Sequence, residues 1–246
     1  MSLNISDLVN EDASLISRRC WSDEGVYALE KRGIFGKSWL FLGHESQIRA
    51  PGDFVQAYMC ETPIILSRGQ DGGIYGNINS CTHRGLPVCR ADHGNTKRFV
   101  CPYHNWSYSV EGNLMTIPQE SEVVRKPDKT QLGLKRVPRV ESWRGMIFGS
   151  FDEAIIPLDE YLGDMRFYLD AFFDRFPAGI EFMGAPHRWV INANWKLPVE
   201  NQLGDVNHGA FLHSAIIPIE AQQLIEKLGH SVVTTPGHGA TFRLMP

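Results

Sequence analysis

Two short clusters, Cys81-Thr82-His83 and Cys101-Pro102-Tyr103-His104, constrain this chain of 246 residues more than any other feature. Each cluster offers one thiolate and one imidazole as possible metal ligands. A structural zinc site more often takes its cysteines from one short arm and its histidines from another, whereas both arms are mixed here. Mixed arms suit a site with two metal ions, one held by the thiolates and the other by the imidazoles.

This pattern predicts a 2Fe-2S cluster with Rieske ligation, in which Cys81 and Cys101 hold one iron and His83 and His104 hold the other. A zinc knuckle and unrelated surface residues remain as alternatives. Gly85, shortly after the first cluster, permits a sharp turn. Neutral histidine ligands and backbone amides that point at sulfur both raise the reduction potential above that of an all-cysteine cluster. The predicted site would therefore accept electrons readily.

Composition excludes several classes of protein. The chain is 43% hydrophobic and 21% charged, which is typical of a soluble globular protein. Its formal net charge of −4 gives no broad basic field, so we expect neither nucleic acid nor an anionic membrane as a partner. No run approaches the roughly 20 apolar residues that span a bilayer. The first 15 residues lack a secretory signal, and an odd number of cysteines suits a reducing compartment. We expect a cytoplasmic protein.

Local patterns divide the chain into three regions, 1–38, 39–155 and 156–246. In the first region, a capping hydroxyl followed by two acids predicts a helix from Ser22 to about Phe35. This helix leads into the second region, where the pattern of apolar residues changes.

The second region is rich in β signals. Its short runs of β-branched and aromatic residues fall at 54–59, 63–67, 74–78 and 146–151, with turn signals between them. Both clusters of cysteine and histidine fall in its turns, and His93-Gly94-Asn95 indicates a further, solvated turn. We therefore predict a small antiparallel β domain that holds both ligand loops.

The third region combines helices with one strand-like run. Apolar residues recur at helical spacing from Leu158 to Phe176, and we interpret this stripe as core packing. The strand-like run at 188–191 precedes a second helix that opens near Pro198, a residue tolerated in a first turn. Together the three regions predict an α+β fold.

The second helix of the third region carries another chemical signal. On a 3.6-residue period Asn201, Asp205 and His208 share one face, so Asp205 can accept the spare N–H of His208. His213 could join the same metal only if the helix bends or ends near Gly209. Two histidines at this spacing are weak support on their own. Beside a one-electron carrier, however, they favour a mononuclear non-haem iron with open positions.

These motifs resemble the α subunits of Rieske non-haem iron aromatic ring-hydroxylating oxygenases, in particular the naphthalene dioxygenase group. The resemblance rests on C-x-H-R-G, C-x-Y-H-x-W and N-x-x-G-D-x-x-H-x4-H, and on the flanking segments Trp21–Tyr27, Trp39–Leu42 and Asn194–Lys196. It covers nearly the whole chain but only about the first half of a family α subunit. We therefore expect a longer protein, in which an aspartate beyond Pro246 completes the iron site.

The resemblance implies a role for each candidate residue. Cys81, His83, Cys101 and His104 would hold the Rieske cluster, and His208 and His213 would hold the mononuclear Fe(II). Asp205 would bridge a cluster histidine of one subunit to an iron histidine of its neighbour, and Asn201 would lie beside the iron and the substrate. Asn105 stands where many relatives have glycine, and we expect the turn to survive because asparagine tolerates left-handed backbone.

The resemblance also implies the surroundings of the site. The three regions become a lead-in helix packed on the catalytic domain (1–38), a Rieske domain (39–155) and the beginning of a helix-grip catalytic domain with an antiparallel sheet (156–246). Electrons would come from NAD(P)H through a reductase, often with a ferredoxin, and O2 and an aromatic ring would react at the iron. The oligomer would be α3 or α3β3. A Rieske electron carrier without substrate chemistry, or a structural zinc module, are the alternatives.

Overall fold

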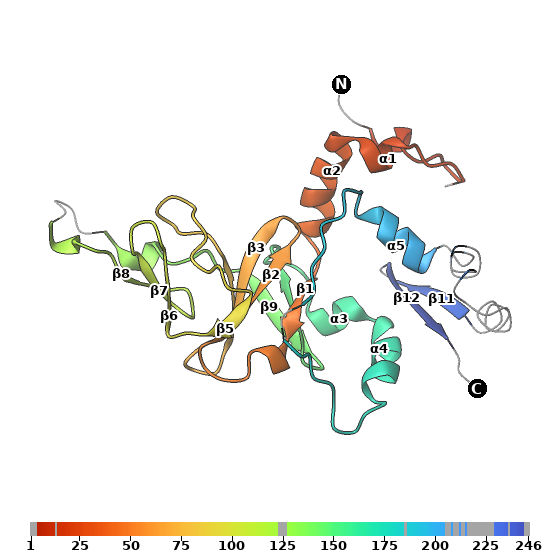
Figure 1. The fold of residues 1–246 in the computed structure, drawn as a ribbon. Helices are drawn as coiled ribbons and strands as arrows, with labels where there is room; N and C mark the ends of the chain where they lie inside the picture. Colours follow the sequence, from red (N-terminus) through yellow and green to blue (C-terminus); the bar gives the residue numbers. More distant parts are fainter. Residues whose placement is uncertain are drawn as a thin grey trace. The chain divides into compact units, whose positions relative to one another are not determined.

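The computed structural model describes residues 4–12, 14–122, 127–184, 186–204, 208, 212, 215, 229–235 and 237–243. The chain forms two compact units (Figure 1). Glu30–Leu158 and Ala178–Arg188 form the β unit, and Met1–Leu29, Asp159–Pro177 and Trp189–Pro246 form the mixed unit. Each unit is described by itself.

The β unit contains three antiparallel sheets. One has the order β4-β3-β2-β5, built from β2 (Asp53–Met59), β3 (Thr62–Arg68), β4 (Ile74–Ile78) and β5 (His93–Asn95). Another has the order β1-β10-β9, built from β1 (Leu40–His44), β9 (Arg139–Trp143) and β10 (Met146–Ser150). The third runs β6-β7-β8, with β6 (Arg98–Val100), β7 (Ser107–Ser109) and β8 (Leu114–Thr116). The predicted antiparallel β domain is confirmed.

The four-stranded sheet is packed on both faces because its side chains alternate between two hydrophobic cores. Phe54 and Ile65 enter the core that also contains the predicted ligand cysteines, whereas Val55, Ile64 and Leu66 enter the other. This alternation follows from the two-residue period of a strand. The ligand loops are therefore supported by a sheet with no solvated face at its centre.

Short helical turns occur in both the β unit and the mixed unit. They are η1 (Ile5–Asp7), η2 (Lys31–Phe35, a π-helical turn), η3 (Glu45–Gln47), η4 (Glu120–Glu122) and η5 (Lys129–Gln131). The helices are α1 (Arg19–Ser22), α2 (Glu24–Glu30), α3 (Leu158–Leu162), α4 (Met165–Phe173) and α5 (Lys196–Leu203). A hairpin of β11 (Gly229–Thr234) and β12 (His238–Arg243) belongs to the mixed unit. No helix within these described segments has the length and apolar character needed to cross a membrane.

The predicted helix from Ser22 is divided in the structure between α1, which ends at Ser22, and α2, which begins at Glu24. Ser22 ends α1, and its hydroxyl donates to the Arg18 carbonyl. Asp23 caps α2 instead, because its carboxylate accepts from the Gly25 amide at 2.8 Å. A carboxylate at a helix N-terminus also meets the positive end of the helix dipole.

The apolar stripe from Leu158 onward is divided between two helices, because Gly163 adopts a left-handed φ of +48° between them. The prediction that the stripe packs in a core holds for Leu158, Leu162, Met165 and Phe173, which are buried. It is wrong for Phe172 and Phe176, which are 54% and 58% exposed. Helical spacing shows which residues share a face and not which face is covered.

Two other local predictions are wrong. The run 188–191 forms no strand, and Trp189, Val190 and Ile191 are exposed. A strand needs a neighbour for its backbone hydrogen bonds, and none of the described strands pairs with this run. The predicted turn at His93–Asn95 is instead edge strand β5, which pairs with the start of β2.

Candidate functional site

Both ligand loops are closed by the same pair of backbone hydrogen bonds. The Cys81 amide donates to the Leu86 carbonyl at 2.9 Å, and the Gly85 amide donates back to the Cys81 carbonyl at 2.7 Å. In the second loop the Cys101 amide donates to Trp106 at 2.8 Å, and the Asn105 amide donates back to Cys101 at 2.9 Å. The two loops are thus copies of one backbone turn, although their histidines stand two and three residues after the cysteine.

The fourth residue after each cysteine has left-handed backbone. Gly85 has a φ of +81° and Asn105 a φ of +57°. The expectation that asparagine preserves the turn is therefore confirmed. Glycine and asparagine are the residues that reach this conformation at least cost.

Burial separates the thiols from the imidazoles. Cys81 and Cys101 are 3% and 2% exposed and belong to one hydrophobic core, together with Tyr108. His83 is exposed and His104 is half-buried. A two-iron cluster held here would have its thiolate end in the protein interior and its imidazole end near solvent, where electrons can enter or leave.

The imidazoles fit the role of ligands. The ring centroids of His83 and His104 lie 4.7 Å apart, at an interplanar angle of 62°. His104 Nδ1 is buried and has no hydrogen-bond partner among the residues that the structure describes. A buried nitrogen without a partner is costly, and bonding to iron would satisfy it. The donor set of two thiols and two imidazoles is the one that a Rieske cluster requires.

The electrostatic surroundings favour the ligating form of His83. Loss of water around the ring, followed by the positive charges of His104 and Arg84, lowers its pKa. A lowered pKa keeps the imidazole neutral, and only a neutral imidazole has a free lone pair for a metal.

Tyr108 touches the sulfur end of the site. Its hydroxyl lies 3.1 Å from Cys81 Sγ and 3.0 Å from Thr82 Oγ1, and it accepts from the Thr82 amide at 3.2 Å. The side chain is fully buried. Burial, followed by the hydrogen bond with Cys81, raises the pKa of Tyr108 to about 12. The hydroxyl therefore stays protonated and can donate to a thiolate.

Asn79 fixes the entry to the first loop. Its buried side-chain oxygen accepts from the amides of Val88 and Cys89 at 2.9 and 3.0 Å, and its nitrogen donates to the Cys89 carbonyl at 2.8 Å. Cys89 itself is buried, and burial raises the pKa of its thiol. This environment is typical of a cysteine that serves as a small core residue.

Sequence reasoning missed the supporting residues. The alternation of Trp106 and Tyr108 after His104 suits either a strand that turns one face to the cluster or ordinary core packing, and it does not predict the contact of Tyr108 with Cys81. Asn79 and Thr82 carry no signal of their own. A polar residue just before a ligand loop could have been suspected of fixing that loop, because such loops need side-chain partners for their backbone groups. The particular partners depend on contacts between distant segments.

The second predicted site is only partly described. Asn201 lies in the last turn of α5 and is half-buried, and His208 is helical and half-buried. Asp205 and His213 lie outside the described residues. The position of α5 is set by the hairpin, since the Thr241 hydroxyl donates to the Gln202 carbonyl at 2.7 Å.

Among the residues that the structure describes, no three side chains of histidine, cysteine, aspartate or glutamate form a group that could share one metal ion. A Rieske cluster needs fewer protein ligands for each metal ion, because each of its irons takes only two side chains from the protein.

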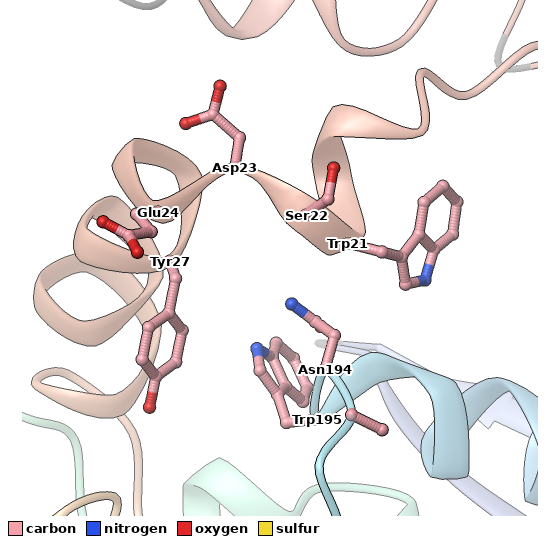
Figure 2. A pocket seen from close by; sticks show the side chains of 8 residues that line it. Trp21, Ser22, Asp23, Glu24, Tyr27, Asn194 and Trp195 are labelled. Carbon is pink, nitrogen blue, oxygen red and sulfur yellow. The ribbon is translucent and has the colours of Figure 1, made fainter.

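A separate pocket of about 350 Å³ lies in the mixed unit (Figure 2). Two segments that support the family resemblance in the sequence, Trp21–Tyr27 and Asn194–Lys196, contribute residues to its wall. Two of its polar groups serve local structure, because Asp23 caps α2 and Asn194 Oδ1 accepts from the Lys196 amide at 3.1 Å. The pocket contains none of the predicted metal ligands.

Comparison with known proteins agrees with this geometry. Residues 38–138 match the family described as the Rieske [2Fe-2S] domain. The α subunit of benzene 1,2-dioxygenase from Pseudomonas putida is 43% identical over 204 residues, which are 83% of this chain and 45% of that subunit. The α subunit of biphenyl dioxygenase from Metapseudomonas furukawaii is 37% identical, over 95% of this chain and 52% of that subunit.

Solved structures give the same result. Naphthalene 1,2-dioxygenase from Rhodococcus sp., bound to indole, has a TM-score of 0.81 and 40% identity, over 91% of this chain and 53% of that chain. Another naphthalene 1,2-dioxygenase with indole in the active site has a TM-score of 0.86 and 37% identity, over 95% and 55%. The chain spans about half the length of the relatives it matches.

Proposed function

Since this chain belongs to the family of Rieske aromatic ring-hydroxylating dioxygenase α subunits, we propose that it is part of a terminal oxygenase component. In this proposal a Rieske cluster passes electrons to a mononuclear non-haem iron that activates O2 to hydroxylate or cis-dihydroxylate an aromatic ring. The relatives are named for benzene, biphenyl and naphthalene. An aromatic hydrocarbon is accordingly the proposed class of substrate.

One observation carries the proposal. Two loops of identical backbone turn bring together two buried cysteines, the exposed imidazole of His83 and the half-buried imidazole of His104, inside the segment that matches the Rieske domain family. Cys81 and Cys101 would anchor the cluster in the core, and His83 and His104 would hold its outer end. Tyr108 would donate a hydrogen bond to Cys81 Sγ, which stabilises added negative charge on the sulfur.

For the second iron we propose His208 and His213 as ligands, Asp205 as the residue that orients a ligand histidine and links subunits, and Asn201 as a neighbour of the substrate. NAD(P)H would supply electrons indirectly, through a reductase and a ferredoxin. The oligomer would be α3 or α3β3 and would work in the cytoplasm, where five cysteines need form no disulfides. The three regions 1–38, 39–155 and 156–246 remain the proposed division of function.

The test uses the full-length subunit with its electron-transfer partners and compares His208→Ala with His93→Ala. His93 is an exposed histidine of edge strand β5 and serves as the control. We expect His208→Ala to lose oxidation of the aromatic substrate while its Rieske absorption and iron-sulfur content stay unchanged. Substrate oxidation at the normal rate in this variant would contradict the proposed second iron. A wild-type subunit that carries electrons but oxidises no aromatic compound would favour the electron-carrier alternative.

A further inference from the structure

Each of the two ligand imidazoles lies against an aromatic ring. His83 is stacked on Trp106, with ring centroids 4.9 Å apart and an interplanar angle of 8°. His104 is stacked on Tyr103, with centroids 3.9 Å apart and an angle of 28°. Both aromatic residues belong to the second loop, so the His83–Trp106 pair connects one loop to the other.

The two aromatic residues differ in how firmly they are held. Trp106 is half-buried and packs against the core that contains both ligand cysteines. Its carbonyl also accepts the hydrogen bond from Cys101 that closes the second loop. Tyr103, in contrast, is 58% exposed and is the sequence neighbour of the ring it covers. Only Trp106 is a fixed surface against which an imidazole plane can be set.

A bond from iron to an imidazole nitrogen leaves the ring free to turn about that bond, so its plane must be fixed by other contacts. We propose that Trp106 is a positioning residue that fixes the imidazole plane of His83 and lowers the reduction potential of the cluster. This inference rests on the proposed Rieske site. The nearly parallel stack fixes the plane, and the core holds the indole.

The sign of the effect on the potential follows from the charge of the ligand. An imidazole bonded to iron carries more positive charge when the cluster is oxidised than after it gains an electron. The face of an indole ring is negative and attracts positive charge, more strongly than the faces of tyrosine or phenylalanine. Trp106 therefore stabilises the oxidised state more than the reduced state. Weaker rings at position 106 should raise the potential in the order Trp, Tyr, Phe.

The experiment compares Trp106→Tyr, Trp106→Phe and Trp106→Leu in the full-length subunit, with its cluster assembled from iron and sulfide. Three quantities are measured: iron and sulfide content, the midpoint potential, and the nitrogen couplings in pulsed EPR of the reduced protein. We expect all three variants to keep the cluster. The potential should rise from wild type through Tyr and Phe to Leu, and only Leu should show altered nitrogen couplings, because it lacks a ring.

Val100→Ala, at an exposed residue of β6, controls for general disturbance near the second loop and should match wild type. Unchanged potentials in the Tyr and Phe variants would overturn the inference, as would wild-type couplings in a Leu variant that retains its cluster. If the Leu variant loses its cluster, the Tyr and Phe potentials alone decide. Failure of the wild-type chain to bind iron and sulfide would instead refute the proposed Rieske site.

Discussion

The hydroxyl of Tyr108, a residue of the hydrophobic core, contacts the thiolate end of the site. It lies 3.1 Å from Cys81 Sγ in a fully buried position. When the reduced cluster gains negative charge, a hydrogen bond to its sulfur ligand becomes stronger. The hydroxyl therefore favours the reduced state.

We accordingly expect Tyr108→Phe to lower the midpoint potential by on the order of 50 mV, since 59 mV corresponds to about 1.4 kcal/mol for one electron. Tyr75→Phe is the control. It also removes a tyrosine hydroxyl that donates a hydrogen bond, but the acceptor is Asp71, at 2.7 Å, which is not a predicted ligand of the cluster. With a Tyr108 pKa of about 12, its hydroxyl keeps its proton up to about pH 11. The difference between wild type and Tyr108→Phe should then be the same at pH 6 and pH 9. A redox titration followed by visible circular dichroism measures both, and equal potentials for the two proteins would contradict the role of Tyr108.

Gly85 and Asn105 occupy equivalent positions in the two loops, which makes one a template for substitutions of the other. A Cβ at Gly85 would meet only Ser80 Oγ, at 3.7 Å, so space does not forbid a side chain. We predict that Gly85→Asn retains the cluster and that Gly85→Val destabilises the loop by about 1–2 kcal/mol, because valine resists left-handed backbone. Iron and sulfide content per chain checks this. Equal cluster loss in both variants would show that space, and not backbone conformation, limits this position.

Residue types allowed the left-handed turn at Asn105 to be predicted, because αL-tolerant residues are few. Metal donors are also few, so residue types put forward Cys81, His83, Cys101 and His104 as the proposed ligands of the first site. The partners of those residues could not be predicted. Tyr108 meets Thr82 and Cys81 across 26 and 27 positions of sequence, and Asn79 meets Cys89 across 10. Such contacts depend on how strands pair, and a single sequence does not fix that pairing.

At the level of elements, the turn between β9 and β10 shows how packing adds to backbone strain. Arg144 and Gly145 form this two-residue turn, with φ of +52° and +81°. Two positive φ values match the twist of the paired strands. A Cβ at Gly145 would lie only 2.5 Å from Nε2 of buried His44. Gly72 has the same φ of +81° and nothing within 4 Å of such a Cβ.

We predict that Gly72→Ala costs about 1 kcal/mol of unfolding free energy, for backbone strain alone. Gly145→Ala should cost about 1–3 kcal/mol more, because the histidine ring must move within a packed core. Chemical denaturation of both variants gives the difference between them. Equal losses would mean that His44 moves aside freely.

The predicted strands were recovered where β-branched runs alternate between two cores, as in β2 and β3. Prediction failed where an element depends on a partner. β5 is a strand only because it pairs with β2, and Trp189–Ile191 has strand-forming residues without a paired neighbour among the described strands. The strand propensity of a segment shows that it can form a strand, and whether it does so depends on a neighbouring strand with which it can pair.

At the scale of the whole molecule, the units are assembled from separate segments, which patterns read along the chain do not reveal. The segment Ala178–Arg188 returns to the β unit after the helices of the third region. The Phe182 ring stacks on His44, with centroids 4.7 Å apart and an angle of 7°, and the Phe182 amide donates to Ser46 Oγ at 2.8 Å. Arg188 pairs with Asp92 at 2.9 Å.

This returning segment should stabilise the β unit without contributing to cluster binding. The ring of Phe182 lies beside strand β1, with its centroid 6.1 Å from that of Phe41. Neither phenylalanine belongs to the core that contains the predicted ligand cysteines. We predict that Phe182→Ala lowers the unfolding free energy of the β unit by about 1–2 kcal/mol, from lost stacking and burial.

Met183→Ala is the matched control, because Met183 is the next residue and is 92% exposed, so its loss should change the unfolding free energy by less than about 0.5 kcal/mol. Denaturation followed by the visible absorption of the cluster reports unfolding and cluster loss together. Both variants should bind iron and sulfide like wild type before denaturation. A Phe182→Ala protein that is fully stable but poor in iron would instead make the returning segment part of the metal site. Equal stability of the two variants would mean that the stack with His44 contributes nothing measurable.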